Sequence, residues 1–269
     1  MTPNTMTPPG LSQSPTRSGR PATAPMSRWK AAGIHLLISA GIAGSLVALM
    51  LAVWYPWPLF ELAGGSGLTI ILVGVDMVLG PLITLVIFRA GKKGLKFDLA
   101  VIAALQLSAL AYGVHAVYAV RPAYEVFTLD RFDLVAAVDL DPADLAKATR
   151  EEFRSSPATG PRYVAAVMPD EPAERQKILE SGIAGKDLQL FPQHYVPFEQ
   201  QAKNALRKAR SLSVLAKRDP NTVQDFLASS GRTEASVKFL PLRARSGDGA
   251  VLLDAESGMP LRILRIDPW

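Results

Sequence analysis

The sequence predicts a membrane protein: a three-helix transmembrane bundle followed by a soluble α+β domain with a C-terminal β-meander. Three apolar runs occupy residues 34–54, 68–88 and 99–120, and each is long enough to cross a hydrocarbon core of roughly 30 Å as an α-helix. After residue 122 the pattern changes to short strand-like and helix-like segments. An apolar content of 49% fits a chain that is part membrane and part soluble.

The segment before the first apolar run, residues 1–27, is rich in Pro, Thr, Ser and Gly and shows no apolar periodicity. Such a composition cannot bury enough apolar surface to offset its ordering entropy, so it predicts a disordered cytoplasmic tail. Met26, just ahead of the first apolar run, is an alternative start to Met1. The run itself is longer than a signal-peptide core and ends at Trp54-Tyr55-Pro56-Trp57, which favours an uncleaved helix with an interfacial aromatic belt.

Flanking charges predict the orientation of the membrane domain, residues 28–122. The loop between the first two apolar runs has no basic residue and one acid, Glu61, whereas basic residues flank the other helix ends. The positive-inside rule then places the N-terminus in the cytoplasm and residues 123–269 in the periplasm of a bacterium. The basic residues are Arg17, Arg20, Arg28 and Lys30 before the first run, and Arg89, Lys92, Lys93 and Lys96 between the second and third.

Residues 123–269 predict a soluble α+β domain. Alternation and turn signals indicate strands, whereas acidic caps and three- and four-residue apolar steps indicate helices. The expected strands are one or two within 124–140, then 162–169, 236–244, 250–255 and 261–267, with a hairpin through Glu256–Met259. The expected helices are 141–153, 170–182, 199–218 and a shorter one that ends at Gly231.

Several function classes find no support in the residues. The chain has no cysteine, which excludes disulfides, thiol nucleophiles and cysteine metal sites. No two of its three histidines have ligand spacing, so we expect no metal and no cofactor. We find no P-loop, no G-x-G-x-x-G and no G-x-S-x-G, and the net charge of +5 reflects membrane-flanking residues more than a nucleic-acid surface. We expect a protein that is not an enzyme and does not bind nucleic acid.

An aspartate within the second apolar run is the main candidate for function. A charge at the bilayer centre costs about 2.5–3.5 kcal/mol, so Asp76 should not face lipid. Thr69, Asp76, Gly80 and Thr84 share one helix face, and Pro81 removes the usual hydrogen-bond partner of the Met77 carbonyl. Gln106 and Gly113 belong to a matching small-polar stripe on the third run, and His35, Ser39 and Ala43 to one on the first.

Three interpretations of this face stay open. Asp76 could be protonated or hydrogen-bonded and only fix helix packing, the face could bind a partner, or Asp76 could transfer protons. An aspartyl protease is disfavoured because the apolar runs hold one carboxylate, and that chemistry needs two. The candidate partner-binding residues are Asp76, Gly80, Pro81, Thr84, Gln106 and Gly113.

The run "GVDMVLGPLITLVIF…GKKGLKFDLAVIAALQLSALAYGVHAVYAVRPAYEVF" carries a family resemblance. Together with "SRWKAAGIHLLIS", "DRFDLV" and "LRILRIDPW" it resembles the TfpX/TfpZ family of type IV pilin accessory proteins. The resemblance implies a non-enzymatic, chaperone-like modulator in the bacterial inner membrane that affects pilin stability, assembly or surface piliation. It implies type IV pilin as the partner, bound through its apolar helix, and the same faces would allow a homo-oligomer.

Two other function classes compete with the resemblance. One is a small oligomeric proton-coupled transporter that uses Asp76, disfavoured because three helices form a poor conduit and a second charged partner is missing. The other is an envelope sensor, for which the sequence offers no cytoplasmic output module.

Overall fold

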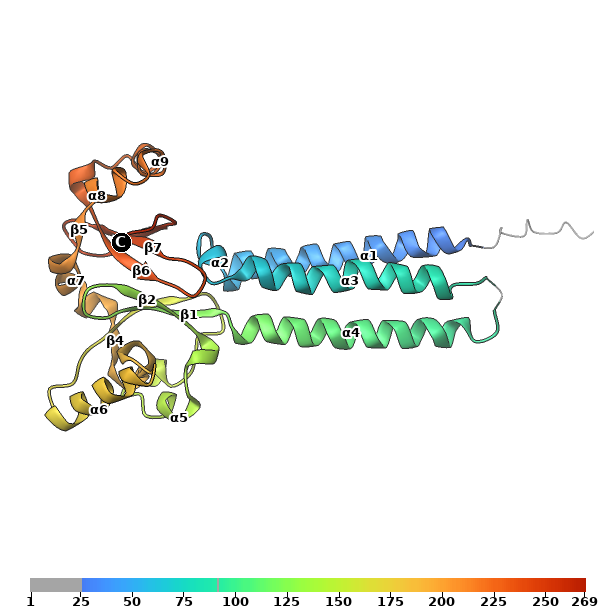
Figure 1. Cartoon of the computed structure of the whole chain (residues 1–269), viewed down its shortest axis with the longest axis horizontal. Helices are drawn as coiled ribbons and strands as arrows, with labels where there is room; N and C mark the ends of the chain where they lie inside the picture. Colours follow the sequence, from blue (N-terminus) through green and yellow to red (C-terminus); the bar gives the residue numbers. More distant parts are fainter. Residues whose placement is uncertain (1–25, 91) are drawn as a thin grey trace, which may run out of the picture.

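Three long helices project from one side of a mixed β-sheet domain (Figure 1). The computed structural model describes residues 26–90 and 92–269, except for the side chains of Leu68, Ile71, Leu72, Val75 and Asp76. The predicted disordered tail therefore lies outside the described residues, apart from Met26 and Ser27. The start of α1 and the loop between α3 and α4 lie together at the far end of the helices, away from the sheet domain.

Three long helices and the short α2 come first in the chain, and the strands, mixed with short helices, follow. The helices are α1 (Arg28–Leu49), α2 (Leu59–Leu62), α3 (Gly65–Ile87), α4 (Leu95–Ala119), α5 (Pro142–Leu145), α6 (Pro172–Ile183), α7 (Ala202–Lys208), α8 (Ser213–Ala216) and α9 (Pro220–Ser230). The strands are β1 (Pro122–Phe127), β2 (Phe132–Ala136), β3 (Arg162–Ala166), β4 (Tyr195–Pro197), β5 (Arg210–Ser211), β6 (Val237–Arg243), β7 (Gly249–Asp254) and β8 (Pro260–Leu264).

Two of the long helices are apolar enough along their described residues to cross a membrane. They are α1, which continues through a π-helical turn to Trp54 and spans 27 residues, and α4, which spans 25. The helix α3 has 23 residues, and its last stretch, Met77–Ile87, is apolar and described without a gap. Two candidate spans suggest a membrane anchor, and the third predicted crossing stays a prediction.

The predicted three-helix bundle is wrong in its packing. Along the described residues, α3 packs against α1 on one side and against α4 on the other, and α1 and α4 are not packed along their lengths. Figure 1 shows α1 on one side of α3 and α4 on the other. The buried residues of α1 are four small ones, Ala31, Ala32, Ser39 and Ala43, and they mark the contact face of this helix.

Within the described residues, eight strands form one sheet in the order β4-β3-β1-β2-β6-β7-β8, and β5 pairs with β6. The pairs β1–β3 and β2–β6 are parallel, and the remaining pairs are antiparallel. One edge of β6 is shared, because β5 pairs with Lys238 and Phe239 while β2 pairs with Leu242 and Arg243. The predicted C-terminal meander is confirmed as β6-β7-β8, with Gly258 at a positive φ of 74° in the last turn.

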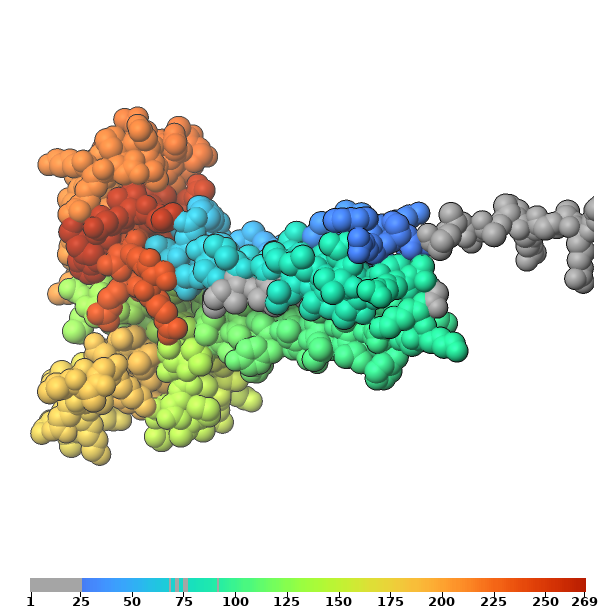
Figure 2. All heavy atoms as spheres, turned by 45° about the vertical axis from the view of Figure 1, so that its right-hand side comes forward, coloured from blue at the N-terminus to red at the C-terminus, as the bar shows by residue number. Residues whose placement is uncertain are grey.

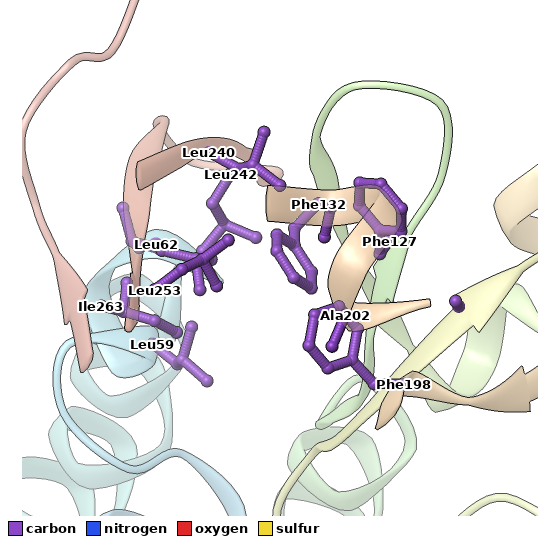
Figure 3. Close-up of a cluster of buried hydrophobic side chains, with 13 residues drawn as sticks. Leu59, Leu62, Phe127, Phe132, Phe198, Ala202, Leu240, Leu242, Leu253 and Ile263 are labelled. Atoms are coloured by element: carbon purple, nitrogen blue, oxygen red, sulfur yellow. The ribbon is translucent and has the colours of Figure 1, made fainter. Parts of the chain in front are cut away.

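The central hydrophobic core contains a short helix from the first half of the chain (Figure 3). Leu59 and Leu62 of α2 are buried among strand residues such as Leu253 and Ile263, opposite the aromatic rings of the same cluster. The backbone N–H of Ser246 donates to the Leu62 carbonyl at 3.0 Å. Residues 59–62, which fall inside the predicted membrane domain, therefore pack into the core of the soluble domain.

The predicted helix 199–218 is wrong, because the chain there is α7, β5 and α8. Ala202 and Ala205 pack with Leu240 on one face of β6, whereas Leu212 and Leu215 pack with Phe239 on the other. Side chains alternate between the faces of a strand, so these two sets belong to different cores. A continuous helix cannot reach both, and the chain instead changes faces along the edge of β6.

The predicted helix 141–153 is also shorter than expected, since α5 ends at Leu145 and a 3₁₀ turn covers Glu151–Phe153. Leu145 and Phe153 belong to the same cluster of buried residues. On a continuous helix they would point about 80° apart, at about 100° per residue. The break in the helix brings both side chains into that cluster.

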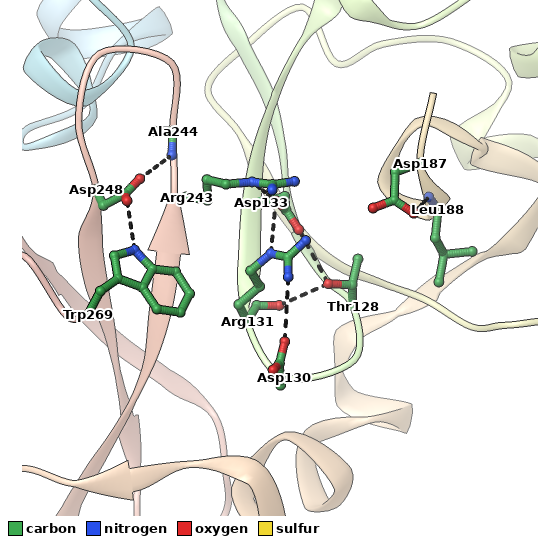
Figure 4. A network of polar contacts seen from close by, with 10 residues as sticks. All are labelled: Thr128, Asp130, Arg131, Asp133, Asp187, Leu188, Arg243, Ala244, Asp248 and Trp269. Carbon is green, nitrogen blue, oxygen red and sulfur yellow. Dashed lines mark hydrogen bonds and ion pairs between the residues drawn. The ribbon is translucent and has the colours of Figure 1, made fainter. Parts of the chain in front are cut away.

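Polar contacts link neighbouring strands in the middle of the sheet and hold the C-terminus on the meander (Figure 4). Asp133 is buried and accepts from Arg243 Nε at 2.8 Å, from Arg131 Nε at 3.3 Å and from the Thr128 hydroxyl at 3.3 Å. These partners come from the β1–β2 turn and from β6, so the network fixes the parallel pairing of β2 with β6. The indole N–H of Trp269 donates to Asp248 at 2.7 Å and holds the last described residues on the meander.

Candidate functional site

A polar cluster joins all three long helices in the half next to the α3–α4 loop. The ring nitrogen Nδ1 of His35 on α1 lies 2.6 Å from the hydroxyl of Thr84 on α3. Thr84 is only 3% exposed, so its hydroxyl is shielded from solvent and lipid and is satisfied by this hydrogen bond. Helix periodicity brings His35, Ser39 and Ala43 to the same face of α1, and the last two are buried.

Glycine at position 80 makes this cluster sterically feasible. A Cβ atom at Gly80 would lie 2.0 Å from Nε2 of Gln106 and 3.0 Å from Nε2 of His35. Real Cβ atoms essentially never approach a heavy atom that closely, so any larger residue would displace the two side chains. Gly80 therefore lets nitrogen atoms from α1 and α4 approach the backbone of α3 at one point.

The carboxamide of Gln106 has unused hydrogen-bonding capacity. Its Nε2 atom is buried and has no hydrogen-bond partner among the described residues. A buried donor without an acceptor costs about 1–3 kcal/mol, and hydrocarbon offers no water to replace the acceptor. An acceptor oxygen supplied from outside the chain would remove this cost.

A groove of about 300 Å³, which we call the α1 groove, opens beside this cluster between α1 and α4. His35, Thr84 and Gln106 are its polar lining residues, and the rest of the lining is apolar. The apolar lining includes Ala31 on α1 and Ala103 on α4, whose small side chains leave the helix backbones on both sides of the groove accessible. The groove is thus an apolar channel along the helices with polar groups at one depth.

The predicted site residues have different outcomes. Gly80, Thr84 and Gln106 come together, as their shared faces predict. Pro81 is within α3, next to the cluster. Gly113 is seven residues beyond Gln106, about 10 Å further along α4, and does not line the α1 groove. The backbone of Asp76 lies one turn from Gly80, but its side chain is outside the described part, so its role stays a prediction.

A second set of contacts, which the sequence does not reveal, joins the long helices to the soluble domain. The Tyr55 hydroxyl donates to the Val117 carbonyl at 2.8 Å, and Arg121 Nη2 donates to the Pro157 carbonyl at 2.7 Å. The rings of Trp54 and Tyr118 meet edge to face with centroids 5.2 Å apart. We call these residues the junction, and they fix how the soluble domain sits on the helix ends.

The soluble domain holds one buried carboxyl group without a charged partner in the described structure. Glu125 on β1 is 3% exposed and pairs in register with Tyr163 on β3. Burial raises the pKa of Glu125 to about 8, and a hydrogen bond with the Tyr163 side chain partly opposes that rise. Its Oε2 atom has no partner among the described residues, which fits a carboxyl that is protonated at neutral pH.

Over the described residues, no three His, Asp or Glu side chains gather in a way that could hold a metal ion. The features that stand out are apolar helices, a polar cluster between them and the contacts of the junction. Together they define a membrane-anchored protein with a soluble C-terminal domain.

Comparison with known proteins identifies the family. Residues 25–64 match the model of the family described as "Fimbrial assembly protein FimB". The chain is 30% identical over 232 residues to a fimbrial assembly protein of Dichelobacter nodosus serogroup I, covering 84% of this chain and 90% of that protein. A serogroup E1 protein from the same organism is 32% identical with the same coverage. The chain belongs to the fimbrial assembly protein family.

The match to the family model has a structural counterpart, since residues 25–64 include α1 and α2. No solved structure matches the chain. The resemblance to pilin accessory proteins is thus confirmed at the level of fimbrial assembly, without the narrower TfpX/TfpZ name.

Proposed function

We propose that this protein is an inner-membrane accessory factor for type IV pili, which holds a pilin subunit by its apolar helix. The family supports a role in pilus assembly, because its members are named fimbrial assembly proteins. The observation that carries the proposal is the α1 groove with its Gln106 amide, whose Nε2 atom has no hydrogen-bond partner among the described residues. In this proposal the protein is a chaperone-like modulator of the TfpX/TfpZ type and not an enzyme.

The packing of the long helices supports a helix as the ligand. In the described structure α3 is flanked by α1 and α4, and the space between those two is apolar and open. Ile34 and Ile38 line it and are exposed, which suits contact with another apolar surface in a membrane. A fourth helix laid in this space would cover the cluster and complete a four-helix arrangement.

The polar cluster supports a ligand with a hydrogen-bond acceptor or a charge at the same depth. An apolar pilin helix carries polar groups near its N-terminus, which lipid cannot satisfy. Gln106 Nε2 and His35 Nε2 converge within the groove and can donate to such a group. The backbone of Asp76 is one turn away on α3, so we include this residue in the proposed site.

The proposed orientation is N-terminus in the cytoplasm and soluble domain in the periplasm. Arg28 and Lys30 precede or open α1, and Arg89 and Lys92 follow α3, so the basic residues lie at the helix ends away from the soluble domain. Trp54, Tyr55 and Tyr118 lie at the opposite ends. Basic residues on the cytoplasmic side and aromatic rings at an interface support this topology.

The first test is a deletion strain in which total pilin and sheared surface pilin are both measured. The proposal expects surface pilin to change and complementation to restore it. A fall in total pilin as well would indicate protection of the subunit, and an unchanged total would indicate action at assembly or retraction. If neither pool changes, the pilin proposal is wrong.

The groove itself is tested by co-purification of pilin with the full chain from membranes. Gln106→Leu and Asp76→Leu should keep the protein inserted and lower pilin recovery several-fold, because Gln106→Leu removes a donor to the ligand and Asp76→Leu removes an acceptor or counter-charge. Gln176→Leu, on the exposed surface of α6, is the matched control and should recover pilin normally. Normal recovery with both groove variants would exclude the α1 groove as the pilin site.

A further inference from the structure

A second groove lies between α3 and α4, next to the loop that joins them. It encloses about 560 Å³, and most of its lining side chains are apolar. Val86, Phe97 and Leu105 line it and are each more than two-thirds exposed. Figure 2 shows α3 and α4 side by side along the length of the molecule. We call this the loop groove.

The mouth of the loop groove is positively charged. Arg89, Lys92 and Asp98 line it, and Lys92 Nζ lies 2.5 Å from the carboxylate of Asp98. This pair is neutral overall, so Arg89 sets the charge of the mouth. Arg89 is exposed, and Lys93 and Lys96 are exposed nearby in the sequence. The groove thus runs from an apolar channel along two membrane-type helices to a cationic opening at their ends.

This pattern matches one kind of molecule. We propose that the loop groove binds an anionic phospholipid, with an acyl chain along the apolar channel and the phosphodiester at Arg89. A guanidinium presents paired N–H donors that fit phosphate oxygens, and its charge complements the headgroup. Basic pockets between helices on the cytoplasmic side of a membrane are places where anionic headgroups bind. The inference does not depend on pilin as the partner of the α1 groove.

The chemistry of the two grooves distinguishes their ligands. The α1 groove has its polar groups within the channel, so it suits a ligand with a polar group at depth. The loop groove shares Ile102 and Gln106 with the α1 groove, but it adds ionic groups, Arg89, Lys92 and Asp98, around the helix ends and next to the α3–α4 loop. A lipid has this arrangement, because its charge is at the headgroup and its tails are apolar.

The test is lipid retention by the purified full chain in detergent, measured by native mass spectrometry. Phosphatidylglycerol is the probe, and phosphatidylcholine is the neutral comparison. We expect phosphatidylglycerol to be retained in preference, and Arg89→Gln to weaken its binding about fivefold, which equals about 1 kcal/mol for one basic residue near the headgroups. Lys93→Gln removes the same charge from the loop without touching the groove lining and should have a smaller effect.

A second variant tests the channel with its charges intact. Val101 lines the loop groove on α4, and Val101→Trp should fill it and lower phosphatidylglycerol retention while the soluble domain melts as in the parent chain. Equal losses with Arg89→Gln and Lys93→Gln would mean diffuse attraction by the loop and would overturn the proposal. Equal retention of phosphatidylcholine, or full retention by Val101→Trp, would overturn it as well. These variants should recover pilin normally in the co-purification test. Loss of lipid binding can therefore be told apart from loss of pilin binding by the α1 groove.

Discussion

The soluble domain and the long helices bury opposite kinds of residue. In the soluble domain the fully buried side chains are large and apolar, such as Phe132, Phe198 and Leu240. On α1 the buried side chains are small, and large ones such as Leu37 point outward, 74% exposed. Water drives apolar groups inward, whereas lipid is as apolar as leucine and leaves small residues and polar contacts to hold helices together.

The short helix α2 buries large apolar side chains, as the soluble domain does, although it lies between two long helices in the sequence. Leu59 and Leu62 are each 2% exposed and belong to the sheet core. The stability of the soluble domain therefore depends on residues from the loop of the membrane part, and the two regions form one structural unit. Four substitutions break or sharpen this comparison, taken from the largest expected effect to the smallest.

Leu62→Ala should cost the soluble domain about 3–4 kcal/mol, because it leaves a cavity in a closely packed core. The measurement is thermal unfolding of the full chain in detergent, followed by circular dichroism. Leu105→Ala makes the same change on α4, where the side chain is 68% exposed, and should shift the melt little. Similar shifts for both variants would show that α2 is not part of the core.

Glu125→Gln should stabilise the soluble domain by about 3 kcal/mol at pH 7. The pKa of Glu125 is about 8 in the folded chain against 4.5 as its ordinary value, because burial disfavours the carboxylate. Unfolding releases the proton between these two values, so the contribution of Glu125 to stability is most favourable below pH 4.5 and falls until about pH 8. Gln has no proton to lose.

Thermal melts of the parent chain and of Glu125→Gln at pH 4 and pH 7 test whether the variant is the more stable of the two at pH 7. The two chains should differ at pH 7 and nearly coincide at pH 4. A difference that is the same at both pH values would show that the carboxyl is not protonated in the folded state.

Gly80→Leu should cost about 1–3 kcal/mol in helix packing, because the new Cβ would overlap with Gln106 and crowd His35. We expect α4 to move away from α1 while the soluble domain melts unchanged. The chain has no cysteine, so spin labels attached at Leu37→Cys on α1 and Leu107→Cys on α4 report a single distance between these two helices. This distance should be longer in Gly80→Leu than in the parent chain. Gly33→Leu, with no atom within 4 Å of its Cβ position, should leave that distance as in the parent.

Arg265→Gln should cost less than about 1 kcal/mol. Arg265 pairs with Glu61 of α2, but its side chain is 60% exposed and exposed ion pairs contribute little. The same thermal melt measures it. A loss as large as that of Leu62→Ala would mean that charge, not apolar burial, attaches α2 to the sheet.

Local signals in the sequence predict much of the soluble fold. The meander and the end of α9 at Gly231, which has a positive φ of 64°, follow from turn and cap residues next to each element. The predicted helix 199–218 fails because its apolar residues serve cores on opposite faces of β6, and periodicity cannot show which core each residue joins. The insertion of α2 is missed for the same reason, since its partners are distant in the sequence.

The candidate site is predicted in part. Helix periodicity assigns Gly80, Thr84 and Gln106 to facing surfaces, and the structure brings them together. Periodicity predicts which face of a helix a residue lies on, but not how far along the helix a groove extends. Gly113 therefore lies on the same face of α4 as Gln106 but does not line the α1 groove. The pairing of His35 with Thr84 depends on the relative height of α1 and α3, which no local pattern encodes.

The insertion of α2 also sets an order for biogenesis. Leu59 and Leu62 leave the ribosome long before β7 and β8, whose residues Leu253 and Ile263 complete their burial. Until those strands arrive, the α2 leucines are exposed beside the long helices. A chain interrupted before the meander would present an uncovered apolar helix there, which is the kind of feature that quality-control proteases recognise.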